Sequence, residues 1–434
     1  MSEKQIKIFS FYLITFLVYT QGFWERFTTL PAQNLLELAI GFVTLFAFRP
    51  KNNRSLLLLG TLFFAGVIIS ILTSTLIPYL KYIRFLLYFY ILLDVFSNIR
   101  FTTQQFNRYF TFLVFMILLQ GVASVYHIFI LGERNEYNVG FMSSLGGTTA
   151  TIFPLFVISI LCVIFYFWRS QKYLIYFLLL FVSVILVGYS SGKRAIYFAI
   201  PAFVFVISLV AYFFYPPKVK SIYFKKTGLI VLLILFCAPI YFFGMKTSGG
   251  FSYGLTGKES NIELLQHSLE YAEGYEAREF DGKTAGRSGT TMQILQKVQS
   301  NPMFLLLGAG FGSMKDEETM DDLGFTYGIV GFTRDIISGG LIFAILTILF
   351  FITIIFRCDY IERDFIADFI CWVILGVFVF TYFGYSANFT TSLKINMMLI
   401  PILSLCNIAR FKEIKRYYYR KYFKIKYVQT TERL

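Results

Sequence analysis

Long apolar stretches alternate with short polar connections along most of the chain. A helix needs about 20 apolar residues to cross the hydrocarbon of a bilayer, and stretches of about that length recur from the N-terminal region to residue 409. This pattern predicts an all-α integral membrane protein with about twelve transmembrane helices. They are expected at 6–23, 30–48, 55–73, 76–96, 109–131, 148–168, 173–189, 195–215, 228–244, 335–356, 366–386 and 393–409.

The composition agrees with a membrane protein, because 57% of the residues are hydrophobic and only 15% are charged. A soluble domain of this length would carry more charge. The five cysteines lie in or beside apolar runs and form no CxxC spacing, so we interpret them as small apolar residues. Residues 6–23 lead into no small-residue cleavage site and are taken as the first span, not as a cleaved signal peptide.

The distribution of Lys and Arg predicts the orientation. Placing the N-terminus inside collects most basic residues on cytoplasmic segments, including the strongly basic tail 410–434, which suits an anionic inner leaflet. The short outer loops then keep only Arg26, Arg134, Lys193 and Arg194. Both termini are therefore expected in the cytoplasm, and Lys193 and Arg194 lie outside, against the general bias.

The chain divides into helices 1–9 (1–244), a large extracytoplasmic loop (245–334), helices 10–12 (335–409) and the tail. The acid-rich part of this loop, 245–325, carries a net charge of −5. It is expected to be ordered and to contain two short helices, one beginning at Asn261 and one running from an N-cap at Ser288 to Pro302. The second would turn Ile294, Leu295 and Val298 to one side, so we expect the loop to cover the outer mouth of the bundle.

Charged residues in or near a membrane are candidates for function. Lys81 and Arg84 stand three apart on one face of the fourth span and either extend to the headgroups or line an outward-facing cavity with Lys193 and Arg194. Four converging cations would suit phosphate or pyrophosphate. Arg287, directly before the predicted Ser288 cap, either grips an anion together with the helix start or pairs with an acid of the loop.

Other patterns predict structure and not chemistry. In "LLLGAGFGSM" the glycines 308, 310 and 312 alternate without GxGxxG spacing, which favours a turn with close backbone packing over a nucleotide site. Glu263, His267 and Glu270 share a helical face, which is more typical of a solvated surface than of a metal site. No metal and no cofactor is therefore expected, and no DxD, HExxH or Ser-His-Asp order is present.

The order of features resembles the O-antigen polymerase and ligase superfamily, in particular the Wzy-type polymerases of bacterial surface polysaccharides. The resemblance covers about residues 188–356: the outer "SSGKR", the loop "GRSGTTMQILQKVQSNPMFLLLGAGFGS", then "MDDLGF" and "FTRDIISGGLIF". The "HN" pair common in ligases is absent, and "MDDLGF" occupies the comparable region, which favours a polymerase.

The resemblance implies a metal-independent glycosyltransferase of the bacterial inner membrane, acting in O-antigen, lipopolysaccharide or capsule synthesis. Donor and acceptor would both be oligosaccharides on a polyprenyl (undecaprenyl) pyrophosphate, a chain-length regulator and a flippase would be partners, and nucleic acid would not. Arg194 and Arg287 fall at the positions of the family's two outer arginines.

The leaving pyrophosphate needs cations and the attacking hydroxyl a carboxylate, which Asp322, Asp321 or Asp335 would supply. We therefore assign Arg194, Arg287 and Asp322 as catalytic, with substrate binding by Lys193, Lys81, Arg84, Arg278, Arg334 and Asp335. A ligase or a polysaccharide flippase or exporter remains the alternative.

Overall fold

The computed structural model describes part of the chain. The described residues are 3–27, 32–49, 54–97, 99, 102–132, 138–142, 153, 157, 171–191, 266, 279–280, 283–284, 286–315, 323–324, 329–356, 365–384 and 398–400. All structural statements below concern these residues.

The described part is mostly helical. Its helices are α1 (Glu3–Tyr19), α2 (Gln21–Phe27), α3 (Ala32–Ala47), α4 (Arg54–Leu72), α5 (Leu76–Ser97), α6 (Thr103–Phe129), α8 (Gln171–Ser191), α13 (Arg287–Ser300), α14 (Pro302–Leu307), α16 (Gly331–Phe356) and α17 (Phe365–Gly384). The 3-10 turns η1 (Gly140–Met142) and η3 (Ser313–Lys315) and a two-stranded antiparallel ribbon, β1 (Glu279–Phe280) with β2 (Lys283–Thr284), complete it.

The membrane character expected from the sequence is supported. Within the described ranges, four helices are long and apolar enough to cross a membrane: Arg54–Leu72, Leu76–Phe96, Asn107–Phe129 and Gly331–Phe356. Helices occupy the first five predicted spans and those at 173–189, 335–356 and 366–386. The spans predicted at 148–168, 195–215, 228–244 and 393–409 lie wholly or largely outside the described residues.

The first predicted span is two helices, not one. α1 ends at Tyr19 and α2 begins at Gln21. The end of α1 is stabilised from α6 by Gln120, whose amide nitrogen donates to the Tyr19 carbonyl at 2.9 Å. The Gln120 side-chain oxygen accepts from the backbone N–H groups of Phe141 and Met142, at 2.8 and 3.1 Å. A single buried amide thus satisfies a carbonyl that the end of α1 leaves open and two N–H groups of η1.

The tenth predicted span is also different, because α16 begins at Gly331, before the predicted residue 335, and is interrupted at Gly340. Gly340 has φ +78°, which no helix contains. The turn after α14 lies against this interruption: the N–H of Ala309 donates to the Ile337 carbonyl at 2.7 Å. A Cβ on Gly308 would lie 2.5 Å from the Ile336 and Ile337 carbonyl oxygens. The predicted glycine turn with close backbone packing is confirmed.

The same turn is fixed on its other side by the connection between α4 and α5. The N–H of Phe311 donates to the Thr75 hydroxyl at 3.2 Å. The buried Phe311 ring lies 4.7 Å from the ring of Tyr79 and 5.2 Å from those of Tyr82 and Phe343. This aromatic cluster joins α5, α16 and the turn into one packed core.

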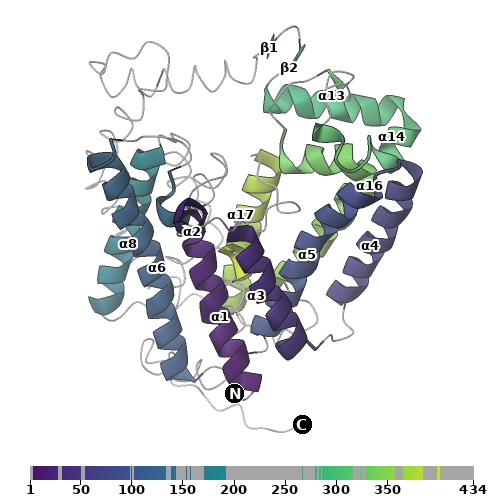
Figure 1. Cartoon of the computed structure of the whole chain (residues 1–434). Coiled ribbons are helices and arrows are strands. Elements are labelled where there is room, and N and C mark those ends of the chain that lie inside the picture. Colours follow the sequence, from purple (N-terminus) through teal and green to yellow (C-terminus); the bar gives the residue numbers. More distant parts are fainter. Residues whose placement is uncertain are drawn as a thin grey trace.

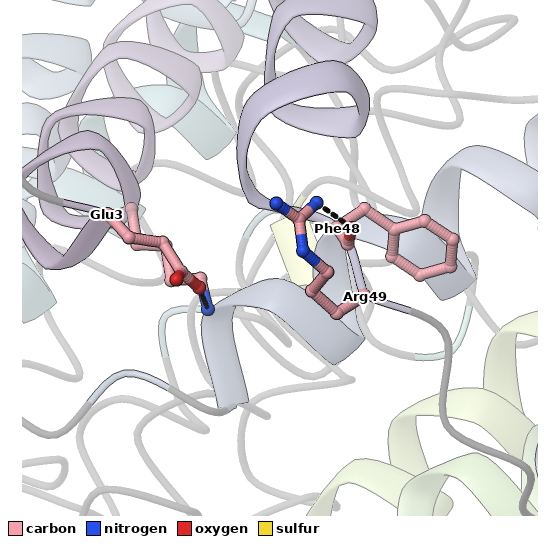
Figure 2. Close-up of polar contacts among 4 residues, drawn as sticks. Glu3, Phe48 and Arg49 are labelled. Carbon is pink, nitrogen blue, oxygen red and sulfur yellow. Dashed lines mark hydrogen bonds and ion pairs between the residues drawn. The ribbon is translucent and has the colours of Figure 1, made fainter.

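The loop helices and the start of the chain lie at opposite ends of the helix bundle. α13 and α14 form a layer at the end opposite to the start of α1 (Figure 1). At the other end, Glu3 pairs with Lys7 at 2.6 Å and the Arg49 guanidinium donates to the Phe48 carbonyl at 2.9 Å (Figure 2). The loop helices and the start of α1 therefore belong to opposite ends, as the predicted topology requires. Which end faces the cytoplasm stays a prediction from the charge distribution.

That orientation is testable by labelling. In a background without the five cysteines, Ser300→Cys at the exposed end of α13 should react in intact cells or spheroplasts with a membrane-impermeant maleimide. Gln104→Cys, exposed in the first turn of α6 at the other end of the bundle, should react only after the membrane is permeabilised. The reverse result would invert the orientation and the assignment of the outer residues with it.

Candidate functional site

Arg287 is the first residue of α13. The cap of this helix is Gly286, not the predicted Ser288, and Gly286 contributes no side-chain hydrogen bond. Ile294 and Val298 are buried on one side of α13, as predicted. Arg287 is partly exposed, and its Nη1 donates to the carbonyl of Gly384, the last residue of α17, at 3.4 Å. The start of α13 therefore lies on the end of α17.

Asp335, in the first turns of α16, is completely buried. One carboxylate oxygen accepts a hydrogen bond from the hydroxyl of Tyr82 on α5 at 2.6 Å, and the other accepts one from Tyr382 on α17, also at 2.6 Å. Hydrogen bonds this short are typical of a hydroxyl donating to an ionised acceptor. Both tyrosines are buried as well.

Arg334 and Arg287 are brought to the same end of α17. Arg334 directly precedes Asp335, whose partner Tyr382 stands two residues before Gly384, the contact of Arg287. The ring of Phe332 lies 5.1 Å from that of Phe383 and 6.3 Å from that of Tyr382, which fixes the start of α16 on the end of α17. Arg287 at the start of α13 and Arg334 at the start of α16 are thus both placed near the end of α17.

Lys81 and Arg84 occupy one face of α5, as their spacing predicts, and that face differs from the one that carries Tyr82. The Lys81 side chain is exposed. Arg84 forms an ion pair with Glu37 on α3 at 3.4 Å and lies 4.8 Å from the centre of the Phe85 ring. Because the charge of Arg84 is paired with Glu37 of the neighbouring helix α3, we favour a structural role for Arg84 over substrate binding.

The ion pair should be visible as an energetic coupling. Glu37→Gln leaves the charge of Arg84 without its partner beside apolar helices, so we expect a loss of about 1–2 kcal/mol in thermal unfolding of the purified protein. The double variant Glu37→Gln/Arg84→Gln should recover much of that loss, and Lys81→Gln should change little. Strictly additive effects of the two substitutions would show that the pair contributes nothing.

Several predicted residues lie outside the described part of the chain: Lys193, Arg194, Arg278, Asp321, Asp322 and the Glu263, His267 and Glu270 set. Among the described residues, no group of three His, Cys, Asp or Glu side chains is arranged to hold a metal ion. The proton acceptor and the first outer arginine therefore remain sequence-based assignments.

Sequence reasoning did not identify Glu37, Tyr82 or Tyr382. Glu37 is the only acidic residue of the apolar run 30–48, so its charge was a usable signal. The tyrosines gave none, because the chain contains 30 of them and nothing in the sequence distinguishes these two.

A scan of protein-family models finds no match to the chain, and searches of curated proteins and of solved structures find none either.

Proposed function

We propose that the protein polymerises oligosaccharide repeat units carried on polyprenyl pyrophosphate, at the outer face of a bacterial cytoplasmic membrane. The order of features along the chain is the main support: an outer basic pair, a long loop with an arginine at a helix start, a glycine turn and a re-entering helix. The placement of Arg287 and Arg334 near the same end of α17 adds to it, because the leaving group of such a reaction is a multiply charged anion.

In the proposed reaction, a sugar hydroxyl of the acceptor attacks the anomeric carbon of the growing chain. The bond from that carbon to the lipid pyrophosphate breaks, and the pyrophosphate leaves with the bonding electrons. Arg287, Arg334 and Arg194 would bind its oxygens as their charge develops. Asp322 would accept the proton of the attacking hydroxyl. No metal takes part in this scheme.

The decisive experiment compares surface glycan in a strain without the gene and in the same strain complemented with it. Loss of the polymerase leaves single repeat units attached to the surface carrier, visible as one band on a gel. Complete polymer that accumulates without transfer would identify a ligase instead, and intact polymer trapped inside the cell would identify an exporter. Purified protein supplied with lipid-linked repeat units should elongate them in the presence of a chelator.

A further inference from the structure

The hydrogen bonds of Asp335 join three helices that are far apart in the sequence. Tyr82 comes from α5, Asp335 from α16 and Tyr382 from α17. We call these three residues the carboxylate clamp. Each tyrosine is held by aromatic neighbours in turn: the Phe311 ring lies 5.2 Å from that of Tyr82, and Phe378 stacks on Tyr382 at 5.0 Å with a 15° angle between the rings. Each tyrosine is therefore packed against an aromatic ring as well as bonded to Asp335.

The clamp also lies beside the candidate cations. Arg334 is the neighbour of Asp335 and interacts electrostatically with it, and Gly384, which accepts the hydrogen bond of Arg287, follows Tyr382 by two residues. The distance between Arg287 and Arg334 thus depends on how α16 sits on α17. Since an error of about 1 Å in such a site can cost about 10²-fold in rate, the contact that fixes these helices bears directly on the reaction.

We propose that Asp335, Tyr82 and Tyr382 are positioning residues that set Arg334 and Arg287 in register for a phosphate-bearing ligand, and that Asp335 is not the proton acceptor of the reaction. Asp335 has no exposed surface, and each of its oxygens already accepts a short hydrogen bond. A general base has to reach the proton that it removes, and this carboxylate is enclosed. The proposal rests on the proposed function for its substrate but not for its geometry.

The test removes one hydroxyl at a time. Tyr82→Phe and Tyr382→Phe should each lower kcat per folded molecule about tenfold, the effect of losing one charged hydrogen bond, with KM nearly unchanged. Tyr79→Phe is the matched control. Tyr79 is a buried tyrosine of α5, as is Tyr82, but its hydroxyl donates to the Leu62 and Phe63 carbonyls and not to Asp335. It should lower the unfolding temperature and leave kcat alone.

A triple variant separates positioning from proton transfer. Tyr82→Phe/Tyr382→Phe/Asp335→Leu replaces the clamp by apolar groups of similar shape, which can be nearly neutral for stability. Positioning predicts that this variant regains activity relative to Asp335→Leu alone, whose two tyrosine hydroxyls lose their acceptor. A folded triple variant as inactive as Asp335→Leu would overturn the proposal, because activity would then depend on the carboxylate itself and not on the packing of the three helices.

Binding of inorganic pyrophosphate to the purified protein provides a readout that needs no elongation. Free pyrophosphate carries the full charge of the departed leaving group, which the lipid-linked donor does not, so its affinity follows kcat and not KM. Calorimetry should show affinity weakened about tenfold in Tyr82→Phe and Tyr382→Phe and unchanged in Tyr79→Phe. Equal affinity in all three would overturn the proposal. If the wild-type protein does not elongate repeat units but the variants still show these differences in pyrophosphate affinity, the proposed function is wrong. The positioning role of Asp335, Tyr82 and Tyr382 is then still supported.

Discussion

Arg287→Lys should reduce elongation about 10²–10³-fold although the charge is kept. A guanidinium presents a planar fork of donors that matches two phosphate oxygens, and an ammonium cannot reproduce it. Because the interaction strengthens as the pyrophosphate leaves, the loss should appear in turnover and not in the affinity for the lipid-linked donor. Single-turnover elongation by purified protein measures both quantities.

Lys297→Gln provides the control for Arg287→Lys. It removes a charge from the last turn of the same helix, far from the contact with Gly384, and should leave elongation unchanged. Arg194→Lys should behave like Arg287→Lys, and Lys193→Arg should be tolerated better. An Arg287→Lys protein that is inserted normally and still makes full-length polymer would assign Arg287 a structural role.

Gly308→Ala should destabilise the protein by about 3 kcal/mol or more. About 1–3 kcal/mol comes from the backbone of Gly308, because its φ of +65° and ψ of −152° lie in a region that is essentially restricted to glycine. The remainder comes from the new methyl group, which would lie 2.5 Å from two carbonyl oxygens of α16 and 2.8 Å from the backbone nitrogen of Gly340. Neither partner is a flexible side chain, so α14 or α16 has to move. Thermal unfolding in detergent should report the loss.

Gly132→Ala isolates the first cause, the backbone conformation. Gly132 has φ +64°, almost the same as Gly308, but a methyl group there would meet nothing within 4 Å. It should therefore cost only the conformational part, about 1–2 kcal/mol. Equal losses of unfolding free energy in Gly308→Ala and Gly132→Ala would mean that the glycine turn and α16 can move apart at little cost.

The helix pattern was the most predictable part of the structure. α4 and α5 lie within one residue of the predicted 55–73 and 76–96, because long apolar runs bounded by polar residues leave few alternatives. The interruptions were missed. Hydropathy is unchanged across Gly340, and at Thr20 it falls toward Gln21 and Gly22 as it does at the end of any span. What permits each break is a distant partner, Gln120 in one case and the 308–312 turn in the other.

The candidate site was likewise predicted only in part. Arg287 was assigned from its place directly before a predicted helix start and from the family resemblance, and Arg334 lies in the motif "FTRDIISGGLIF" at the start of the tenth predicted span. Asp335 was found as a carboxylate, but its burial and both of its partners depend on tertiary packing between helices separated by up to 253 residues. A residue whose neighbours come from so far along the chain cannot be assigned a role from local spacing.

That separation also has a consequence for biosynthesis. At about 5–20 residues per second, a ribosome needs about 13–50 s to proceed from Tyr82 to Asp335. During this interval α5 can pack only against helices already made, and its contacts with α1, α3 and α4 are all of that kind. The helices α1, α3, α4 and α5 would thus pack together first, before the Tyr82 hydroxyl has Asp335 as its acceptor. Insertion of α16 would then form this hydrogen bond. Translation that stops before residue 335 should leave a product that the cell's membrane quality control recognises.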